Sequence, residues 1–286
     1  MTATIIDGRA LARAVVESVK AQIPSLPRLP GLAVILAGDD PASHVYVNGK
    51  IKRAREVGFN AGVTILPADV SEEAVLAEVA ALNARDDIDG ILVQLPLPAG
   101  LDEEAVLDLV PAEKDVDGLT EASMGRLMRG RPGHVPCTPK GVLRLLERYG
   151  IPTSGQKAVV IGRSSLVGLP LAVLLARKGI DATVTLAHSR TPDLVAACRD
   201  ADIIIGAAGI ARLITAEHVK PGATVIDVGV SRTEAGIVGD VDFESVQAVA
   251  GAITPMPGGT GPMTIACLLE NTLEAARMLG AVPRSA

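Results

Sequence analysis

The alternation of two hydrophobic periods along the chain constrains the fold more than any other feature. Residues 9–22 and 71–84 repeat apolar positions at helical spacing, whereas residues 32–37, 62–67 and 88–95 are short aliphatic runs. Such runs are typical of strands that are buried on both faces of a parallel sheet. Strand and helix in regular alternation predict βαβ units and therefore a mostly parallel α/β sheet.

A second series of aliphatic runs begins near residue 156. It contains five candidate strands, at residues 158–162, 182–187, 201–207, 223–229 and 248–254. Helices are predicted over 138–149, between the two series, and over 263–279. We therefore expect an α/β fold with two α/β domains. The first spans residues 1–140 and is completed by a C-terminal helix at 263–280, and the second spans residues 141–265.

Composition excludes several classes of function. The chain has 27 Lys and Arg against 33 Asp and Glu, so it lacks the concentrated basic charge of a nucleic-acid-binding surface. Its three cysteines form no close pair, and the spacing of its four histidines is unlike that of metal ligands. The apolar stretch that begins at Ala201 reaches Arg212, well short of the ~20 residues that span a bilayer. We expect a cytoplasmic protein without a membrane segment, a metal site or a nucleic-acid partner.

The first strand of the second series leads into a candidate nucleotide-binding turn, GRSSLVGLP at 162–170. The phosphates of a dinucleotide sit where a strand ends and a helix begins, because free helix N–H groups favour an anion. The spacing from Gly162 to Gly168 is neither G-x-G-x-x-G nor a P-loop. An ordinary tight turn, with Gly168 permitting close packing of helix on strand, is therefore the alternative.

The end of the next strand indicates which dinucleotide is bound. NAD-binding folds usually place an acidic residue about 20 positions beyond the glycines, where it holds the ribose hydroxyls. This chain instead has Ser189 and Arg190, and Arg163 lies in the first turn. These side chains can bind a 2′-phosphate, so NADP is favoured over NAD. The alternative for Arg190 is a solvated charge at the start of a helix.

A second cluster of glycine and proline precedes the last helix. Its members are Pro257, Gly258, Gly259, Gly261 and Pro262. Because little side chain covers such a loop, a flat ligand can approach its main-chain groups closely. The loop could equally be a rigid hinge between domains, and the two interpretations are compatible.

Four polar residues of the first domain are candidates for catalysis. Tyr46 and Lys50 are four positions apart and share one face of a predicted helix. Gln94 ends a buried strand, and Asp117 lies in the loop KDVDG, which also contains Asp115. In an apolar cleft the pKa of the lysine would fall towards a value useful for proton transfer. The alternatives are a surface Tyr–Lys pair and an Asx turn begun by Asp117.

Aromatic residues make up only 1% of the chain, with no Trp, two Phe and two Tyr. Phe59 and Phe243 follow apolar patterns, and Tyr149 ends a predicted helix. Tyr46 is therefore the best candidate to stack on a flat ligand.

Taken in order, these segments resemble the bifunctional methylenetetrahydrofolate dehydrogenase/cyclohydrolase family over essentially the whole chain. The matching pieces are ASHVYVNGK (42–50), VQLPLP (93–98), KDVDG (114–118), PCTPKG (136–141), VVIGRSSLVGLP (159–170), HSR (188–190), VIDVG (225–229) and PGGTGPMT (257–264). The resemblance implies a folate-binding catalytic domain, a Rossmann-type NADP-binding domain, an active-site cleft between them and a homodimer. It also implies oxidation of 5,10-methylenetetrahydrofolate with NADP, followed by hydrolysis of the methenyl product to 10-formyltetrahydrofolate.

The resemblance assigns a role to each candidate. Lys50 would be the key residue of the hydrolytic step, Gln94 would tune it, Tyr46 would stack on the folate and Asp117 would anchor the pterin. The implied NADP-lining residues are Gly162, Arg163, Ser164, Ser189 and Val230. The segment from Pro257 to Thr264 would form a wall beside folate and nicotinamide.

Two positions depart from the family pattern: Thr260 stands where valine is common, and Val230 where isoleucine is common. Both changes are nearly isosteric and are expected to be neutral. Three rival functions remain: a monofunctional methylenetetrahydrofolate dehydrogenase, a non-catalytic NADP-binding sensor, and an unrelated Rossmann oxidoreductase similar to shikimate dehydrogenase. The presence of Lys50 and Gln94 argues against the first.

Overall fold

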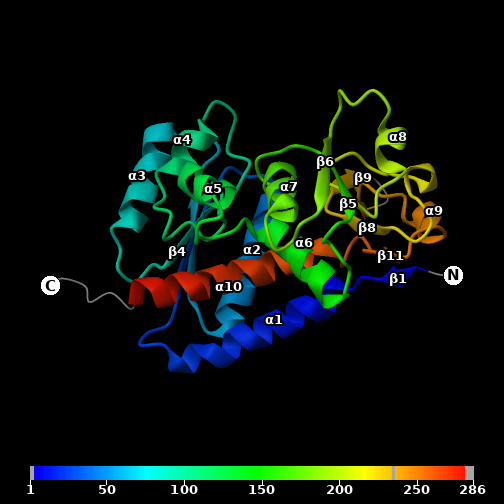
Figure 1. Ribbon diagram of the computed structural model, residues 1–286. Coiled ribbons are helices and arrows are strands. Elements are labelled where there is room, and N and C mark those ends of the chain that lie inside the picture. Colours follow the sequence, from blue (N-terminus) through cyan, green and yellow to red (C-terminus); the bar gives the residue numbers. More distant parts are fainter. Residues whose placement is uncertain (1–2, 234–235, 281–286) are drawn as a thin grey trace. The chain divides into compact units, whose positions relative to one another are not determined.

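The computed structural model describes residues 3–233 and 236–280 and divides the chain into two compact α/β units (Figure 1). Unit 1 consists of Met1–Arg13 and Thr138–Thr264, and unit 2 consists of Ala14–Cys137 and Ile265–Ala286. Helices α1 (Gly8–Gln22) and α10 (Thr260–Gly280) contribute residues to both units. The segment up to Arg13 belongs to unit 1, with residues far later in the sequence, because its strand β1 (Thr4–Ile5) pairs with β11 (Ala252–Ile253).

Unit 1 contains a six-stranded sheet in which every neighbouring pair is parallel. Its spatial order is β1, β11, β8 (Thr224–Asp227), β7 (Ile203–Gly206), β5 (Lys157–Ile161) and β6 (Thr183–Ala187). The helices of this unit are α6 (Cys137–Arg148), α7 (Gly168–Ala176), α8 (Leu194–Cys198) and α9 (Phe243–Gln247), with a 3₁₀ turn at Ala216–His218. From β5 the chain adds β6 on one side and then β7 on the other. The strand order therefore reverses beside β5, which is where open α/β sheets bind ligands.

Unit 2 is built on a three-stranded parallel sheet in the order β3 (Asn60–Leu66), β2 (Gly31–Ala37) and β4 (Gly90–Val93). Its helices are α2 (Pro41–Val57), α3 (Glu72–Asn83), α4 (Glu103–Asp108) and α5 (Glu121–Met128), with a 3₁₀ turn at Ile23–Ser25. All residues of β2 and β4 are buried, as their aliphatic sequences predict. The strand order reverses beside β2, because the chain adds β3 on one side and then β4 on the other, so this unit has a switch point of its own.

Helix α2, which carries two candidate residues, has strong signals at both ends. The Asp40 side chain accepts a hydrogen bond from the backbone N–H of Ser43, Pro41 is the first helical residue, and Gly58 ends the helix at φ +101°. Asn48 and Gly49 are weak helix formers, yet the helix continues through them. Its buried side, which includes Val47, Ile51 and Ala54, supplies the stabilisation.

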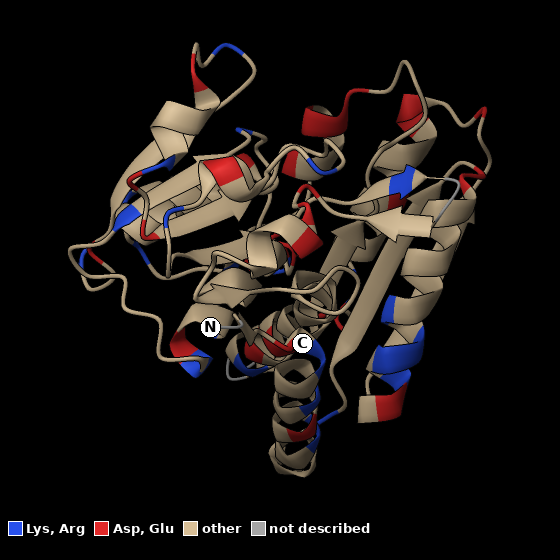
Figure 2. Cartoon of the chain, turned by 90° about the vertical axis from the view of Figure 1, so that its right-hand side faces the viewer, with Lys and Arg blue, Asp and Glu red and all other residues tan. Residues whose placement is uncertain are grey.

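The sequence patterns miss several small elements. The hairpin of β9 (Ser231–Thr233) and β10 (Gly236–Val238) and the short helices α4 and α5 follow no clear period. Helix α10 also begins at Thr260, three residues before the predicted start at 263. Charged residues lie mainly on helices and loops, and the strands carry few of them (Figure 2).

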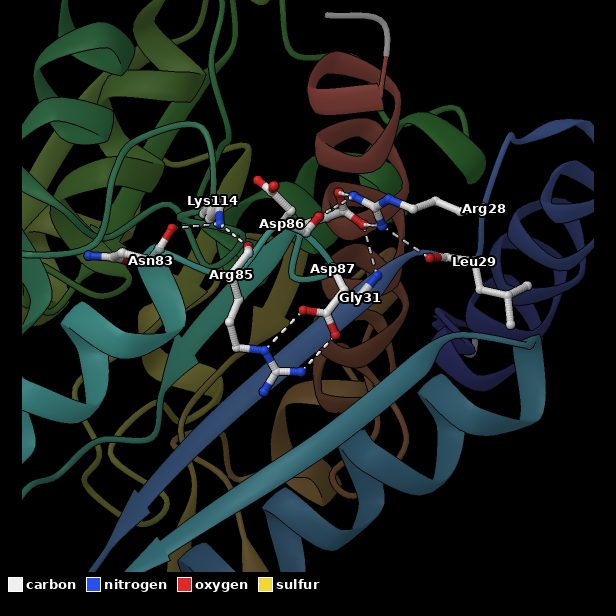
Figure 3. A network of polar contacts seen from close by, with 9 residues as sticks. Arg28, Leu29, Gly31, Asn83, Arg85, Asp86, Asp87 and Lys114 are labelled. Carbon is white, nitrogen blue, oxygen red and sulfur yellow. Dashed lines mark hydrogen bonds and ion pairs between the residues drawn. The ribbon is translucent and has the colours of Figure 1, made fainter. Parts of the chain in front are cut away.

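An ion pair braces the beginning of the sheet in unit 2 (Figure 3). The Arg28 guanidinium donates to both carboxylate oxygens of Asp89, and the backbone N–H of Gly31 donates to Asp89 Oδ2 over 2.8 Å. Asp89 is fully buried, whereas the neighbouring Arg85–Asp87 pair is half exposed on both sides. Because Asp89 is buried, the Arg28–Asp89 pair stabilises the protein only if its close geometry is kept. The exposed Arg85–Asp87 pair is screened by solvent.

Replacing Asp89 by asparagine is expected to lower the free energy of unfolding by about 2 kcal/mol, because an amide NH₂ then faces the donors of Arg28 and Gly31. The matched change Asp87→Asn is expected to cost less than about 0.5 kcal/mol, since exposed pairs contribute little. Urea unfolding followed by circular dichroism measures both. Equal losses in the two variants would contradict the structural assignment.

Candidate active site

A pocket of about 390 Å³ lies at the carboxyl ends of β5, β6 and β7 in unit 1. It is lined by Ile161, Gly162, Arg163, Ser164, His188, Ser189, Thr191, Leu194, Ala207, Ala208, Ile210 and Leu213. Three strand ends thus supply its walls beside the reversal of strand order. This is the position at which doubly wound sheets bind nucleotides.

The glycines of the turn after β5 are required by close backbone packing. Gly162 has φ +118°, and a Cβ on it would lie 2.0 Å from the backbone oxygen of Ala207. A Cβ on Gly168 would lie 2.1 Å from the backbone oxygen of Gly162. Helix α7 can therefore begin directly against the turn that lines the pocket. The tight-turn explanation and the nucleotide-site explanation hold together.

The predicted cofactor residues differ in their relation to this pocket. Gly162, Arg163, Ser164 and Ser189 line it. Arg190 and Val230 are exposed and are not among the lining residues. His188 and Thr191, which sequence reasoning passed over, do line it: the backbone N–H of Arg190 donates to His188 Nδ1 over 3.1 Å.

The predicted glycine–proline wall, Pro257 to Pro262, is a tightly packed segment that does not line this pocket. A Cβ on Gly259 would lie 2.7 Å from that of Thr254, and Gly258 has φ +120°. The Thr260 hydroxyl donates to the backbone oxygen of Asp227 over 2.9 Å. The valine that is common at this position in the family could not make this hydrogen bond. Thr260 therefore has a role that its similarity in size to valine does not predict.

Three of the four candidate catalytic residues of unit 2 contact one another through a buried lysine. Lys50 is 5% exposed, and its Nζ donates to Gln94 Oε1 over 3.0 Å. The same Nζ lies 5.0 Å from the centre of the Tyr46 ring. Gln94 Nε2 donates in turn to the backbone oxygen of Leu95, which fixes its acceptor oxygen toward the lysine. The pair on α2 is therefore not a free surface feature.

The two aspartates of the KDVDG loop have separate tasks. The carboxylate of Asp115 accepts hydrogen bonds from the backbone N–H groups of Gly118, Leu119 and Thr120. The Asx-type turn of this loop therefore belongs to Asp115 rather than to Asp117. The carboxylate of Asp117 is not used by this turn and faces Lys50 instead, and the residue as a whole is half-buried.

Burial dominates the electrostatics of this cluster. It lowers the pKa of Lys50, against the opposing charge of Asp117 and the smaller effect of Cys137. Burial also raises the pKa of Asp117, which the charge of Lys50 counteracts, and raises the pKa of Cys137 well above its usual value. A lysine with a lowered pKa is more often neutral near pH 7, and neutral lysine can accept a proton.

Two residues outside the predicted set hold the backbone beside Asp117 in place. Asn271, fully buried on α10, donates to the backbone oxygens of Val116 over 2.8 Å and Val135 over 3.0 Å. The Cys137 thiol donates to the same oxygen of Val116 over 3.3 Å. Cys137 lies in the segment PCTPKG, but no local signal gives it or Asn271 this role, because the role arises only through partners elsewhere in the sequence.

Among residues 3–233 and 236–280, no group of three or more His, Cys, Asp or Glu side chains is arranged to hold a metal ion. Within the same described ranges, none of the helices combines the length and apolar character needed to cross a bilayer.

These features define a class: two-domain α/β proteins with a nucleotide pocket on one parallel sheet and a buried lysine cluster on the other. Models of known protein families identify the family within this class. The catalytic domain of tetrahydrofolate dehydrogenase/cyclohydrolase matches residues 6–117, and the NAD(P)-binding domain of the same family matches residues 136–279. The chain belongs to the tetrahydrofolate dehydrogenase/cyclohydrolase family, which confirms the resemblance found in the sequence.

Individual relatives agree over nearly their full length. The bifunctional protein FolD of Oleidesulfovibrio alaskensis is 54% identical over 275 residues, which cover 94% of this chain and 96% of the relative. The crystal structure of the bifunctional enzyme FolD from Campylobacter jejuni has a TM-score of 0.94 at 44% identity, covering 96% and 99% of the two chains. The FolD of Trypanosoma brucei, solved with NADP cofactor and an inhibitor, has a TM-score of 0.92 at 40% identity, covering 97% and 98%.

Proposed function

We propose that this chain oxidises 5,10-methylenetetrahydrofolate with NADP and then hydrolyses the 5,10-methenyl product to 10-formyltetrahydrofolate. The observation that carries the proposal is the buried Lys50, bonded to Gln94 over 3.0 Å and facing Asp117, in a chain of this family. A dehydrogenase alone has no need of a lysine whose pKa burial lowers. The alternatives without hydrolysis leave this cluster unexplained.

In this proposal, folate binds two side chains of the cluster of unit 2, and a third side chain positions the lysine. The exposed part of the Tyr46 ring stacks on the flat pterin. The Asp117 carboxylate, free of the loop's turn, accepts paired hydrogen bonds from the N–H edge of the pterin. Gln94 accepts a hydrogen bond from the Lys50 amine and so holds this amine beside the Tyr46 ring and the Asp117 carboxylate. Residues 257–262 are proposed to form a wall of the folate and nicotinamide region.

The pocket of unit 1 fits NADP by its own geometry. Its glycines exclude a Cβ where the turn packs against the backbone, and Ser164, Arg163 and Ser189 offer donors for phosphate oxygens. NADP, when bound, supplies the oxidant that accepts a hydride from the methylene carbon of the folate. The task of the chain in that step is to bind and orient both molecules. We assign NADP to the segment 141–265, and folate chemistry to the segment 1–140 together with helix 263–280.

The hydrolytic step depends on Lys50. Water adds to the methenyl carbon, which is already cationic, and the neutral Lys50 amine takes a proton from that water as the carbon–oxygen bond forms. The bond from this carbon to N5 then breaks as the hydroxyl of the adduct becomes the formyl C=O and gives its proton to solvent, and the lysine returns its own proton to N5. The net reaction consumes one water and releases one proton, so the lysine ends as it began.

Parallel absorbance assays of the purified protein test the function. With methylenetetrahydrofolate and NADP, we expect methenyl absorbance to rise and then decay, and with added methenyltetrahydrofolate we expect accelerated hydrolysis. Stable accumulation of the methenyl product would favour a monofunctional dehydrogenase. NADP binding without any methenyl signal would favour a sensor, and absence of folate binding an unrelated oxidoreductase.

We also propose that the protein acts in the cytoplasm as a homodimer, which the family resemblance supports. Static light scattering of the purified protein tests the dimer, which predicts a mass twice the 29.3 kDa of the chain. Localisation of a tagged chain by cell fractionation tests the compartment.

A further inference from the structure

A buried carboxylate lies directly behind the loop that follows β7. The backbone N–H groups of Ala208 and Gly209 donate to Asp240 Oδ2 over 2.6 and 3.1 Å, and that of Ile210 donates to Asp240 Oδ1 over 2.8 Å. Asp240 is fully buried. Three successive N–H groups that converge in this way form a nest for an anion, and here the chain fills the nest with its own side chain.

The loop that Asp240 holds is part of the nucleotide pocket. Ala207, Ala208 and Ile210 line that pocket together with Gly162 and Arg163, whereas Asp240 is not among the lining residues. The carboxylate therefore acts on the pocket only through the backbone of residues 208–210. Any ligand in the pocket depends on where this backbone lies.

A second buried carboxylate fixes Asp240 itself. Asp227, at the end of β8, accepts hydrogen bonds from the backbone N–H groups of Gly229, Asp240 and Val241, each between 3.0 and 3.1 Å. The backbone oxygen of Asp240 also accepts from the N–H of Ile214 over 2.8 Å. Asp240 thus has a fixed backbone from which its side chain reaches the loop.

Two glycines make room for the paired carboxylates. A Cβ on Gly229 would lie 2.0 Å from Asp240 Oδ1, and a Cβ on Gly239 would lie 1.8 Å from Asp227 Oδ2. Both glycines have ordinary backbone angles, so space rather than conformation requires them here. The segments 227–229 and 239–241 are consequently organised around the two acids.

Among the described residues, the hydrogen-bond partners of the Asp240 carboxylate are backbone N–H groups rather than a side-chain cation. Burial raises the pKa of Asp240, and the three N–H bonds oppose that rise. Bonds from N–H to a carboxylate are shorter and stronger than neutral ones. An asparagine in the same place would turn an NH₂ toward at least one of the three donors, and the loop would move to relieve the clash.

We propose that Asp240 is a positioning residue for NADP: its carboxylate holds residues 208–210 in the conformation that shapes the cofactor pocket. This inference rests on the proposed function, since it takes NADP as the ligand of the pocket. Asp240 touches neither substrate nor cofactor, and its influence is confined to cofactor affinity. The Lys50 cluster on which hydrolysis depends uses no NADP and belongs to the other unit, so hydrolysis is an internal measure of intact protein.

The test compares Asp240→Asn with the matched change Asp242→Asn. Asp242 is two residues further on, and its side chain makes no hydrogen bond at the start of α9. For Asp240→Asn we expect the KM for NADP to rise at least tenfold, kcat at saturating NADP to change less than threefold, and methenyl hydrolysis to stay at the wild-type rate. For Asp242→Asn we expect all three to stay within twofold of wild type. Isothermal titration calorimetry, in which NADP is added to each ligand-free protein, measures the affinity for NADP directly.

Each other outcome overturns the inference. An unchanged NADP affinity in Asp240→Asn shows that the loop does not depend on the carboxylate. A parallel loss of both activities, or failure to fold, shows that Asp240 supports the whole unit rather than the pocket. If the wild-type protein itself neither binds NADP nor oxidises methylenetetrahydrofolate, then the proposed function fails first, which the wild-type assay reveals independently of the variants.

Discussion

Replacing Lys50 by methionine is expected to slow methenyltetrahydrofolate hydrolysis by roughly 10²- to 10⁴-fold, the usual contribution of a positioned acid–base group. Methionine has nearly the length of lysine and suits a site that is 5% exposed. It removes a group whose pKa burial lowers, so the fold no longer has to bury an ammonium. The loss should therefore appear in the rate and not in the stability, and a spectrophotometric hydrolysis assay beside a thermal melt separates the two.

Lys52→Met is the matched control, because Lys52 lies on the same helix but is exposed. It should leave hydrolysis unchanged. Binding of NADP should survive in both variants, since the cofactor pocket is lined by residues of the other unit alone. The pH profile gives a further check: hydrolysis by wild type should rise with pH and level off below pH 10.5, the ordinary pKa of lysine. Wild-type hydrolysis in Lys50→Met would rule out the proposed role.

The sequence predicts the regular part of this fold well, because parallel strands and amphipathic helices leave periodic patterns. The aliphatic run 32–37 becomes β2, and the helical pattern 71–84 becomes α3. The elements that the sequence does not predict are those that depend on partners far away along the chain. Strand β1 is two residues long and exists through its pairing with β11, about 250 residues away, so no local pattern could assign it.

The candidate site divides in the same way. Residue spacing places Tyr46 and Lys50 on one helix face, and the strand end places Gln94 near a ligand site. The sequence does not decide which aspartate of KDVDG makes the turn, because either could; the backbone bonds to Asp115 decide it. Asp240 carries no signal at all, since its function depends on three N–H groups some thirty residues earlier.

The second large effect is expected at Arg163. Its side chain and Ser189 both belong to residues that line the nucleotide pocket, and no acidic side chain is among them. A 2′-phosphate can therefore bind there, held by a charge-assisted bond that contributes about 1.5–3 kcal/mol. Arg163→Ala is expected to raise the KM for NADP roughly tenfold to a hundredfold, as this free energy implies. The KM for NAD, which lacks the phosphate, should change little in steady-state assays with each cofactor.

Arg190→Ala is the control variant for the prediction at Arg163. Like Arg163 it is exposed, and it lies one residue from Ser189, yet it does not line the pocket. If the two arginines share the phosphate, as the sequence alone suggests, Arg190→Ala should match the effect of Arg163→Ala. If only lining residues reach it, Arg190→Ala should raise the KM for NADP by less than threefold, which is the result we expect. An equal loss of NADP and NAD affinity in Arg163→Ala would contradict the 2′-phosphate role, because the arginine would then bind a part that both cofactors share.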